Sequence, residues 1–236
     1  MRNKSRVCAI VVAAGKGLRL RSKVSKPLVP LGHKPLFIYC LEALNKHPQV
    51  CDIVLVTSVE NKSFIIEQAA KYDIDKVMRV VLGGVRRQDS VERGLAVVSR
   101  QSDMILIHDA CRPFINAKMI TSVILAARKS GAAILGVPVK ETIKQVASRQ
   151  SPVASRIVKK TLDRNQLWVA QTPQCFRKDL ILGAYKKFGK LSVTDDAALV
   201  ERSGCRVSLI NGSYDNIKIT TPQDLVIAEE LIRKWK

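Results

Sequence analysis

Between residues 7 and 137 the chain alternates short apolar runs with segments whose apolar residues recur at helical spacing. Consecutive parallel strands need a crossover of a dozen or more residues, usually a helix. The alternation therefore predicts a doubly wound α/β fold with a mostly parallel sheet. The expected strands cover 7–14, 52–57, 76–82, 104–108 and 132–137, and the expected helices cover 36–46, 61–72, 90–98 and 117–130.

A different pattern follows Pro138. Residues 139–150 and 155–162 are polar, β-prone runs on either side of Ser151-Pro152, and they predict a hairpin that projects from the sheet. A lone hairpin buries little apolar surface, so we expect a second subunit to stabilise it. Residues 1–236 are then one domain with a dimerisation arm at about 139–166.

The alternation resumes after this arm. Thr221 is the expected N-cap of a terminal helix that runs to Lys236, with Pro222 at the first helical position. The other expected elements are an extended segment at 168–171, helices over 178–188 and 195–203, and strands over 206–210 and 217–220.

Composition narrows the class of partner. The chain has 236 residues, of which 40 are basic and 20 acidic, and its formal charge of +20 favours nucleotides, phosphorylated metabolites or nucleic acid. Aromatic residues make up only 5% and no nucleic-acid-binding module is recognisable, which argues against nucleic acid. A solvated surface rich in lysine is the other explanation of the charge.

Six scattered cysteines form no C-x-x-C pair, which favours reduced thiols over disulfides or zinc. The basic residues 1–6 precede an apolar run that stops at Gly15, too early for a membrane span, and we interpret that run as a strand and not as a signal peptide. The sequence therefore predicts a cytoplasmic protein without a membrane segment.

The first predicted strand ends in a loop suited to an anion. Ile10–Val12 lead into Ala13-Ala14-Gly15-Lys16-Gly17, and the cations Arg19, Arg21, Lys23 and Lys26 follow. Backbone N–H groups of small residues can approach a triphosphate closely. An ordinary turn before a solvated basic stretch is the alternative. A Walker A loop and a dinucleotide fingerprint are excluded, because Gly17 follows Lys16 and Leu20 stands where glycine is needed.

Two more loops follow predicted strands, at Gly83-Gly84 and at Asp109. Carboxyl ends of parallel strands share one edge of the sheet, so we expect both loops beside Gly15. Asp109 suits Mg²⁺ against phosphates, or it caps a turn and pairs with Arg112. Ser90 either contacts a base or caps the following helix.

The order of motifs resembles a known family. It runs AAGKGLRL, SKPL, GGVRRQDSV, HDACRP, VPVKETIK, TLDRNQLW, QTPQ, TDDAALVE and DNIKIT, from Ala13 almost to the end of the chain. This order closely resembles the 2-C-methyl-D-erythritol 4-phosphate cytidylyltransferases of the non-mevalonate isoprenoid pathway. The resemblance implies the Rossmann-like nucleotidyltransferase fold, a homodimer with interlocking β-arms, and the use of CTP and Mg²⁺.

Roles follow from the resemblance, motif by motif. Arg19 and Lys26 would stabilise charge on the α-phosphate, and Asp109 would hold the metal. Arg164 would reach the acceptor of the partner subunit. The CTP-binding residues would be Ala13, Ala14, Gly15, Lys16, Gly17, Gly84, Ser90 and Lys218. The acceptor-binding residues would be Asp109, Arg112, Thr142, Arg164, Thr172, Asp215 and Lys218.

The implied reaction transfers CMP from CTP to 2-C-methyl-D-erythritol 4-phosphate, with in-line attack of the acceptor phosphate on the α-phosphate. Three motifs depart from the family pattern: Ser25-Lys26-Pro27 replaces Pro-Lys-Gln, Val85 replaces a base-contacting aspartate, and Cys111 replaces alanine. These departures leave the acceptor open, and a ribitol 5-phosphate cytidylyltransferase is the nearest alternative. A nucleic-acid-binding protein is the alternative of another class.

Overall fold

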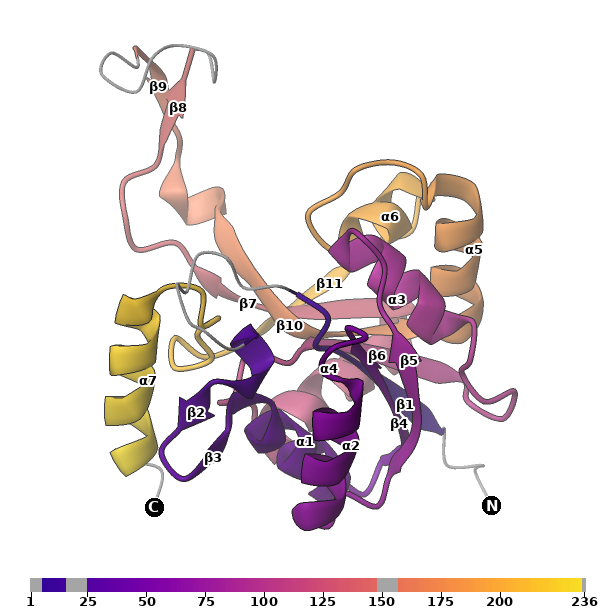
Figure 1. The fold of residues 1–236 in the computed structure, drawn as a ribbon. Coiled ribbons are helices and arrows are strands. Elements are labelled where there is room, and N and C mark those ends of the chain that lie inside the picture. Colours follow the sequence, from indigo (N-terminus) through magenta and orange to yellow (C-terminus); the bar gives the residue numbers. More distant parts are fainter. Residues whose placement is uncertain (1–5, 16–24, 148–156, 235–236) are drawn as a thin grey trace.

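The computed structural model describes residues 6–15, 25–147 and 157–234. Within these ranges one sheet of seven strands has the order β11-β7-β10-β6-β1-β4-β5 (Figure 1). Every neighbouring pair is parallel except those of β10, which is antiparallel to β6 and β7. The predicted α/β fold with a mostly parallel sheet is confirmed. The strands are β1 Val7–Val12, β4 Val50–Thr57, β5 Val77–Leu82, β6 Met104–Asp109, β7 Ala132–Pro138, β10 Trp168–Arg177 and β11 Ser208–Asn211.

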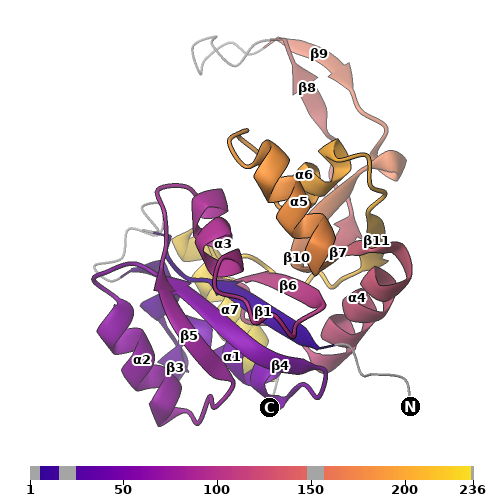
Figure 2. The same ribbon diagram turned by 90° about the vertical axis from the view of Figure 1, so that its right-hand side faces the viewer.

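Helices cover both faces of this sheet (Figure 2). Side chains of β1 alternate between the two layers: Ala9 and Val11 pack beneath α1, α2 and α4, whereas Cys8 and Ile10 pack beneath α3, α5 and α6. Burial on both faces explains why the strand is continuously apolar. The helices are α1 Leu36–Lys46, α2 Lys62–Lys71, α3 Arg87–Leu95, α4 Ala117–Ser130, α5 Lys178–Phe188 and α6 Ala197–Arg202. None of the described helices is long and apolar enough to span a membrane.

A third apolar cluster lies beside the layer formed by α1, α2 and α4. The terminal helix α7 (Pro222–Lys234) packs Ala228 against Leu31 and Phe114. Leu31 belongs to a short antiparallel pair, β2 (Pro30–Leu31) and β3 (Lys34–Pro35), which follows the 3-10 helix η2 (Lys26–Leu28). This cluster anchors the segment that carries Lys26.

The predicted hairpin is a two-stranded antiparallel sheet of β8 (Lys144–Val146) and β9 (Val158–Thr161). Figure 1 shows it extending away from the main sheet, joined to β10 through the 3-10 helix η3 (Arg164–Gln166). Ile157 and Val158 are exposed on it. Residues 148–156, which include Ser151-Pro152, lie outside the described residues.

Two expectations about strands were wrong. β10 is a ten-residue central strand and not a short segment at 168–171, since its register with β7 shifts between Gln171 and Gln174 and so accommodates Pro173. Residues 217–220 form no strand, although the N–H of Ile219 donates to the carbonyl of Cys111 at 2.9 Å. That contact brings Lys218 to the end of β6.

Two helical glycines should respond in opposite ways to alanine. A Cβ on Gly94 in α3 would lie 2.7 Å from Cγ2 of Ile10, so Gly94→Ala should lower the free energy of unfolding by about 1–3 kcal/mol. A Cβ on Gly183 in α5 would meet no atom within 4 Å, so Gly183→Ala should raise it by about 0.5–1 kcal/mol. Urea unfolding of both variants measures the difference, and equal shifts would contradict the packing of α3 on β1.

Candidate active site

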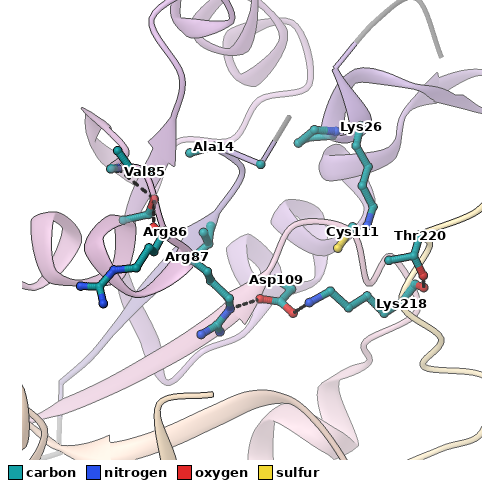
Figure 3. Close-up of a pocket in the computed structure, with 14 residues that line it drawn as sticks. Ala14, Lys26, Val85, Arg86, Arg87, Asp109, Cys111, Lys218 and Thr220 are labelled. Atoms are coloured by element: carbon teal, nitrogen blue, oxygen red, sulfur yellow. Dashed lines mark hydrogen bonds and ion pairs between the residues drawn. The ribbon is translucent and has the colours of Figure 1, made fainter. Parts of the chain in front are cut away.

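A cavity of about 520 Å³ opens at the carboxyl ends of β1, β5 and β6. Gly15, Gly84 and Asp109 all line it, so the three loops meet as predicted. Figure 3 shows Lys26 entering from η2 and Lys218 from the segment before α7. A smaller cavity of about 190 Å³ adjoins it, and the two share Arg87, Asp109 and Lys218 in their walls.

The loop after β1 supplies small residues to the larger cavity. The N–H of buried Ala13 donates to the carbonyl of Val56 at 2.7 Å, which prolongs the sheet, and Ala14 and Gly15 then reach the cavity wall. Three predicted residues of this motif, Lys16, Gly17 and Arg19, fall in 16–24, outside the described residues.

The loop between β5 and α3 lies tightly against its neighbours. A Cβ on Gly84 would lie 2.3 Å from Cβ of Asp89, so only glycine fits there. Ser90 Oγ accepts from the Gly84 N–H at 3.0 Å and donates to the Arg86 carbonyl at 3.2 Å. The interpretation of Ser90 as the helix cap was wrong, because α3 begins at Arg87. Ser90 instead fixes the loop from within the first turn, and both it and Gly84 line the cavity.

Asp109, at the end of β6, is the centre of the charge arrangement. Its Oδ1 accepts from Arg87 Nε at 2.8 Å and its Oδ2 pairs with Lys218 Nζ at 2.7 Å (Figure 3). Burial by itself raises the pKa of Asp109, but the charges of Arg87 and Lys218 outweigh it and hold that pKa well below its usual range. The carboxylate is therefore ionised throughout the neutral range, and its side chain pairs with these two cations and not with Arg112.

Arg112 and Thr172 form the wall of the smaller cavity. Arg112 Nη1 donates to the Asn216 carbonyl at 2.7 Å, so its guanidinium ties this loop to the segment that carries Lys218. Thr172 Oγ1 accepts from the Asp109 N–H at 3.1 Å and contacts His108 Nδ1 at 3.1 Å. Burial lowers the pKa of His108 to about 4, which leaves a neutral, packed imidazole.

Three predicted acceptor residues are not brought to either cavity of this chain. Thr142, Arg164 and Asp215 are exposed and line neither wall. Arg164 Nη1 donates to the Lys140 carbonyl at 2.8 Å within the base of the arm. The described part of the arm therefore places Thr142 and Arg164 away from both cavities.

Lys26 faces the larger cavity and forms no ion pair with a carboxylate of the described residues. Burial lowers the pKa of Lys26, and the like charge of Lys218 lowers it further, while the Cys111 thiol accepts a hydrogen bond from it. Figure 3 shows the Lys26 amine directed toward Cys111 and the Asp109–Lys218 pair. An anion in this cavity would relieve the repulsion between the two lysines.

Arg87 is a residue of this site for which the sequence predicts no role. It is one of two adjacent arginines in the motif GGVRRQDSV, and the sequence does not distinguish them. The structure does: Arg86 pairs with Asp89 on the surface, whereas Arg87 joins Asp109 to Asp196. Arg87 is the first residue of α3, so its position is set where that helix begins. The preference of both carboxylates for one guanidinium appears only after the chain has folded.

The model of one protein family matches residues 7–234, and its description is 2-C-methyl-D-erythritol 4-phosphate cytidylyltransferase (IspD). The chain belongs to this family. A relative of that name from Clostridium novyi (strain NT) is 43% identical over 98% of this chain and 99% of that protein. Another from Syntrophus aciditrophicus (strain SB) is 41% identical over 98% of this chain and 97% of that protein.

Solved structures agree with the cytidylyltransferase family. The crystal structure of 4-diphosphocytidyl-2C-methyl-D-erythritol synthase from Anaerococcus prevotii DSM 20548 has a TM-score of 0.84 to this chain. It is 31% identical and covers 98% of this chain and 97% of its own. The resemblance noted in the sequence and the predicted nucleotidyltransferase fold are confirmed.

Proposed function

We propose that this cytidylyltransferase transfers CMP from CTP to 2-C-methyl-D-erythritol 4-phosphate, giving CDP-methylerythritol and pyrophosphate for isoprenoid precursor synthesis. The observation that carries the proposal is the pair of adjoining cavities with Arg87, Asp109 and Lys218 in their shared wall. Two phosphorylated substrates can meet at such a wall, with CTP in the larger cavity and the acceptor in the smaller one.

The chemistry needs positioning and charge stabilisation more than proton transfer. The acceptor phosphate is already ionised at neutral pH, so its oxygen attacks the α-phosphate in line without a strong general base. His108 is buried and neutral, in keeping with that requirement. Lys26, together with Arg19 from the undescribed segment, would stabilise the charge that develops on the α-phosphate.

Different loops would contact the triphosphate, the cytosine and the acceptor. The triphosphate would lie along the backbone of 13–17, with Lys218 beside it, and the cytosine against Gly84 and Ser90. Val85 is fully exposed at this wall, so recognition of the base would rest on backbone groups and on Ser90. Arg112 and Thr172 would face the acceptor from the smaller cavity.

Mg²⁺ is the proposed cofactor, and the donor set fits it. This ion is usually held by one or two carboxylates together with substrate phosphates. Asp109 lines the larger cavity, and each of its oxygens keeps a second lone pair beyond its bond to Arg87 or Lys218. When bound, the ion would neutralise charge on the triphosphate.

A homodimer is proposed through the arm. Exposed apolar side chains lie along it and at the start of β10, among them Ile157, Val158, Trp168 and Val169. A second copy would cover them and receive Arg164, and with it Thr142, at its acceptor site. Light scattering tests this: Val158→Asp should shift the protein to monomers and lower turnover, and an unchanged dimer would remove the arm from the interface. A cytoplasmic location is also proposed, in keeping with the free, mostly buried thiols.

Pyrophosphate release tests the proposed reaction. Each of the four nucleoside triphosphates is supplied with methylerythritol phosphate, with ribitol 5-phosphate, or with no acceptor. Release only with CTP and methylerythritol phosphate is expected. A preference for ribitol 5-phosphate would show that this compound, and not methylerythritol phosphate, is the acceptor. No release under any condition would contradict the proposed activity. RNA affinity that falls steeply with salt, in the absence of release, would favour a nucleic-acid-binding protein.

The pH dependence should report Lys26. Its pKa is lowered, and its protonated form is the one that stabilises phosphate charge. Activity is therefore full below the lowered pKa and is lost as pH rises through it, at a pH below that of an ordinary lysine. The pH profile of kcat/KM reports groups of the free enzyme, and its alkaline side measures this loss of activity. Lys26→Arg keeps the charge to much higher pH, so kcat/KM of this variant should fall at a higher pH than in the wild-type protein. If the fall occurs at the same pH in both proteins, it belongs to the titration of another group.

A further inference from the structure

Asp196 is a buried carboxylate that does not line the larger cavity. It precedes α6 and its side chain is 1% exposed. Its Oδ2 accepts from Arg87 Nη1 at 2.8 Å, and its Oδ1 accepts from the Tyr185 hydroxyl of α5 at 2.6 Å. Because Arg87 Nε also donates to Asp109, one guanidinium joins a helical layer to the candidate active site.

The charges along this connection alternate. They run from Asp196 through Arg87 and Asp109 to Lys218, from the interior to a side chain that is 38% exposed. The neighbouring cluster is apolar and includes Val91, Ala197 and Leu199. Buried ion pairs are often no more stabilising than apolar residues of the same volume, so stability alone is a weak reason for placing charges here.

The division of the guanidinium between two carboxylates has a consequence for Asp109. An arginine beside a single carboxylate commonly binds both of its oxygens with two parallel N–H groups. Here Nε contacts Oδ1 of Asp109 and Nη1 is held by Asp196. Nη2, the nitrogen that would complete the fork with Nε, is buried and has no hydrogen-bond partner among the described residues. Oδ2 of Asp109 is therefore left to Lys218, the partner that can exchange for a ligand in the cavity.

We propose that Asp196 is a positioning residue, which keeps Arg87 from closing over both oxygens of Asp109. The inference rests on the proposed function, because it assigns Asp109 Oδ2 to the side of the substrates. Tyr185 supports the same arrangement by holding the second oxygen of Asp196. Loss of the Asp196 charge would let the guanidinium turn toward Asp109 and form a second bond there.

Asp196→Asn tests the proposal. The amide keeps the shape and can still accept from Tyr185, but it no longer holds Arg87 by charge. We expect kcat to fall about 10–100-fold, the size of effect that a small misplacement of reacting groups produces, with a change in KM for CTP below about 3-fold. A crystal structure of the variant should show two Arg87 nitrogens within hydrogen-bond distance of Asp109. Asp179→Asn is the control, since Asp179 pairs with Arg177 on the surface.

A double-mutant cycle separates positioning from general destabilisation. If Asp196 acts through Asp109, Asp196→Asn should lower kcat less than about 2-fold further in an Asp109→Asn background. A fall of equal size in both backgrounds, or full kcat in the single variant, would overturn the proposal. If Asp196→Asn does not fold, Tyr185→Phe serves instead, with an expected fall of about 2–5-fold that disappears in the Asp109→Asn background.

The crystallographic experiment does not depend on the reaction. An unmoved Arg87 in Asp196→Asn would refute the inference even if pyrophosphate is released from CTP. Absence of release from the wild-type protein would instead refute the proposed function, and a moved Arg87 would then still establish what Asp196 does.

Discussion

Lys26→Ala is expected to lower kcat by about two to three orders of magnitude while the fold survives. Removal of one preorganised group that stabilises transition-state charge typically has an effect of this size. Lys26 lies in η2 at the wall of the larger cavity and forms no ion pair with any of the described carboxylates. Its truncation therefore leaves no buried carboxylate unpaired. Steady-state kinetics of pyrophosphate release measure the loss, and circular dichroism and urea unfolding follow the fold.

Two further variants make this result specific. Lys26→Arg keeps the charge but changes its shape and should retain an intermediate rate. Lys62→Ala removes an exposed lysine from α2 that lines neither cavity, and it should retain full activity. Near-normal turnover of Lys26→Ala would exclude the lysine from stabilising the α-phosphate.

Asp109→Asn is expected to lower kcat at least about 100-fold and to weaken the fold as well. The substitution removes the charge that faces two cations, and breaking a buried pair by neutralising one partner commonly costs about 3–5 kcal/mol. Arg87 keeps Asp196 and Lys218 is partly exposed, so we expect about 2–4 kcal/mol here. When activity is measured over a range of Mg²⁺ concentrations, the variant should need a higher concentration than the wild-type protein to reach half of its maximal activity.

Asp103→Asn is the matched control for this variant. Asp103 precedes the opposite end of the same strand and is exposed, where it accepts a hydrogen bond from the Arg6 N–H. Its neutralisation should leave turnover and metal requirement unchanged. Equal losses in the two variants would show that strand β6, and not the carboxylate at its end, is what the substitutions disturb.

The order of elements follows from local patterns. Helices α1, α4 and α5 begin and end where the periodicity of apolar residues predicts, and β1 is continuously apolar because it is buried on both faces. That Gly15, Gly84 and Asp109 meet is a consequence of parallel strands sharing a carboxyl edge. The family resemblance then relates these loops to CTP, and the full-length relatives agree with it.

Local sequence patterns do not predict the central position of β10 in the sheet. Its Gln171, Thr172 and Gln174 are polar and lack the alternation that marks a strand. Their partners come from elsewhere in the chain: Thr172 Oγ1 accepts from the Asp109 N–H, and Gln174 Nε2 donates to Asp195 at 2.8 Å. Polar residues can be buried in the middle of a sheet when distant groups satisfy their hydrogen bonds, and no local pattern records this.

By itself the sequence determined the alternating elements, the loops at one edge of the sheet and the family to which they belong, because propensity and apolar spacing act between near neighbours. The tertiary structure alone decided how the charges are paired. Arg87 and Asp196 are 109 residues apart in the chain, and Arg87 and Asp109 are 22 apart. Which of many cations reaches a buried carboxylate depends on how the helices pack on the sheet, and burial then makes that choice energetically decisive.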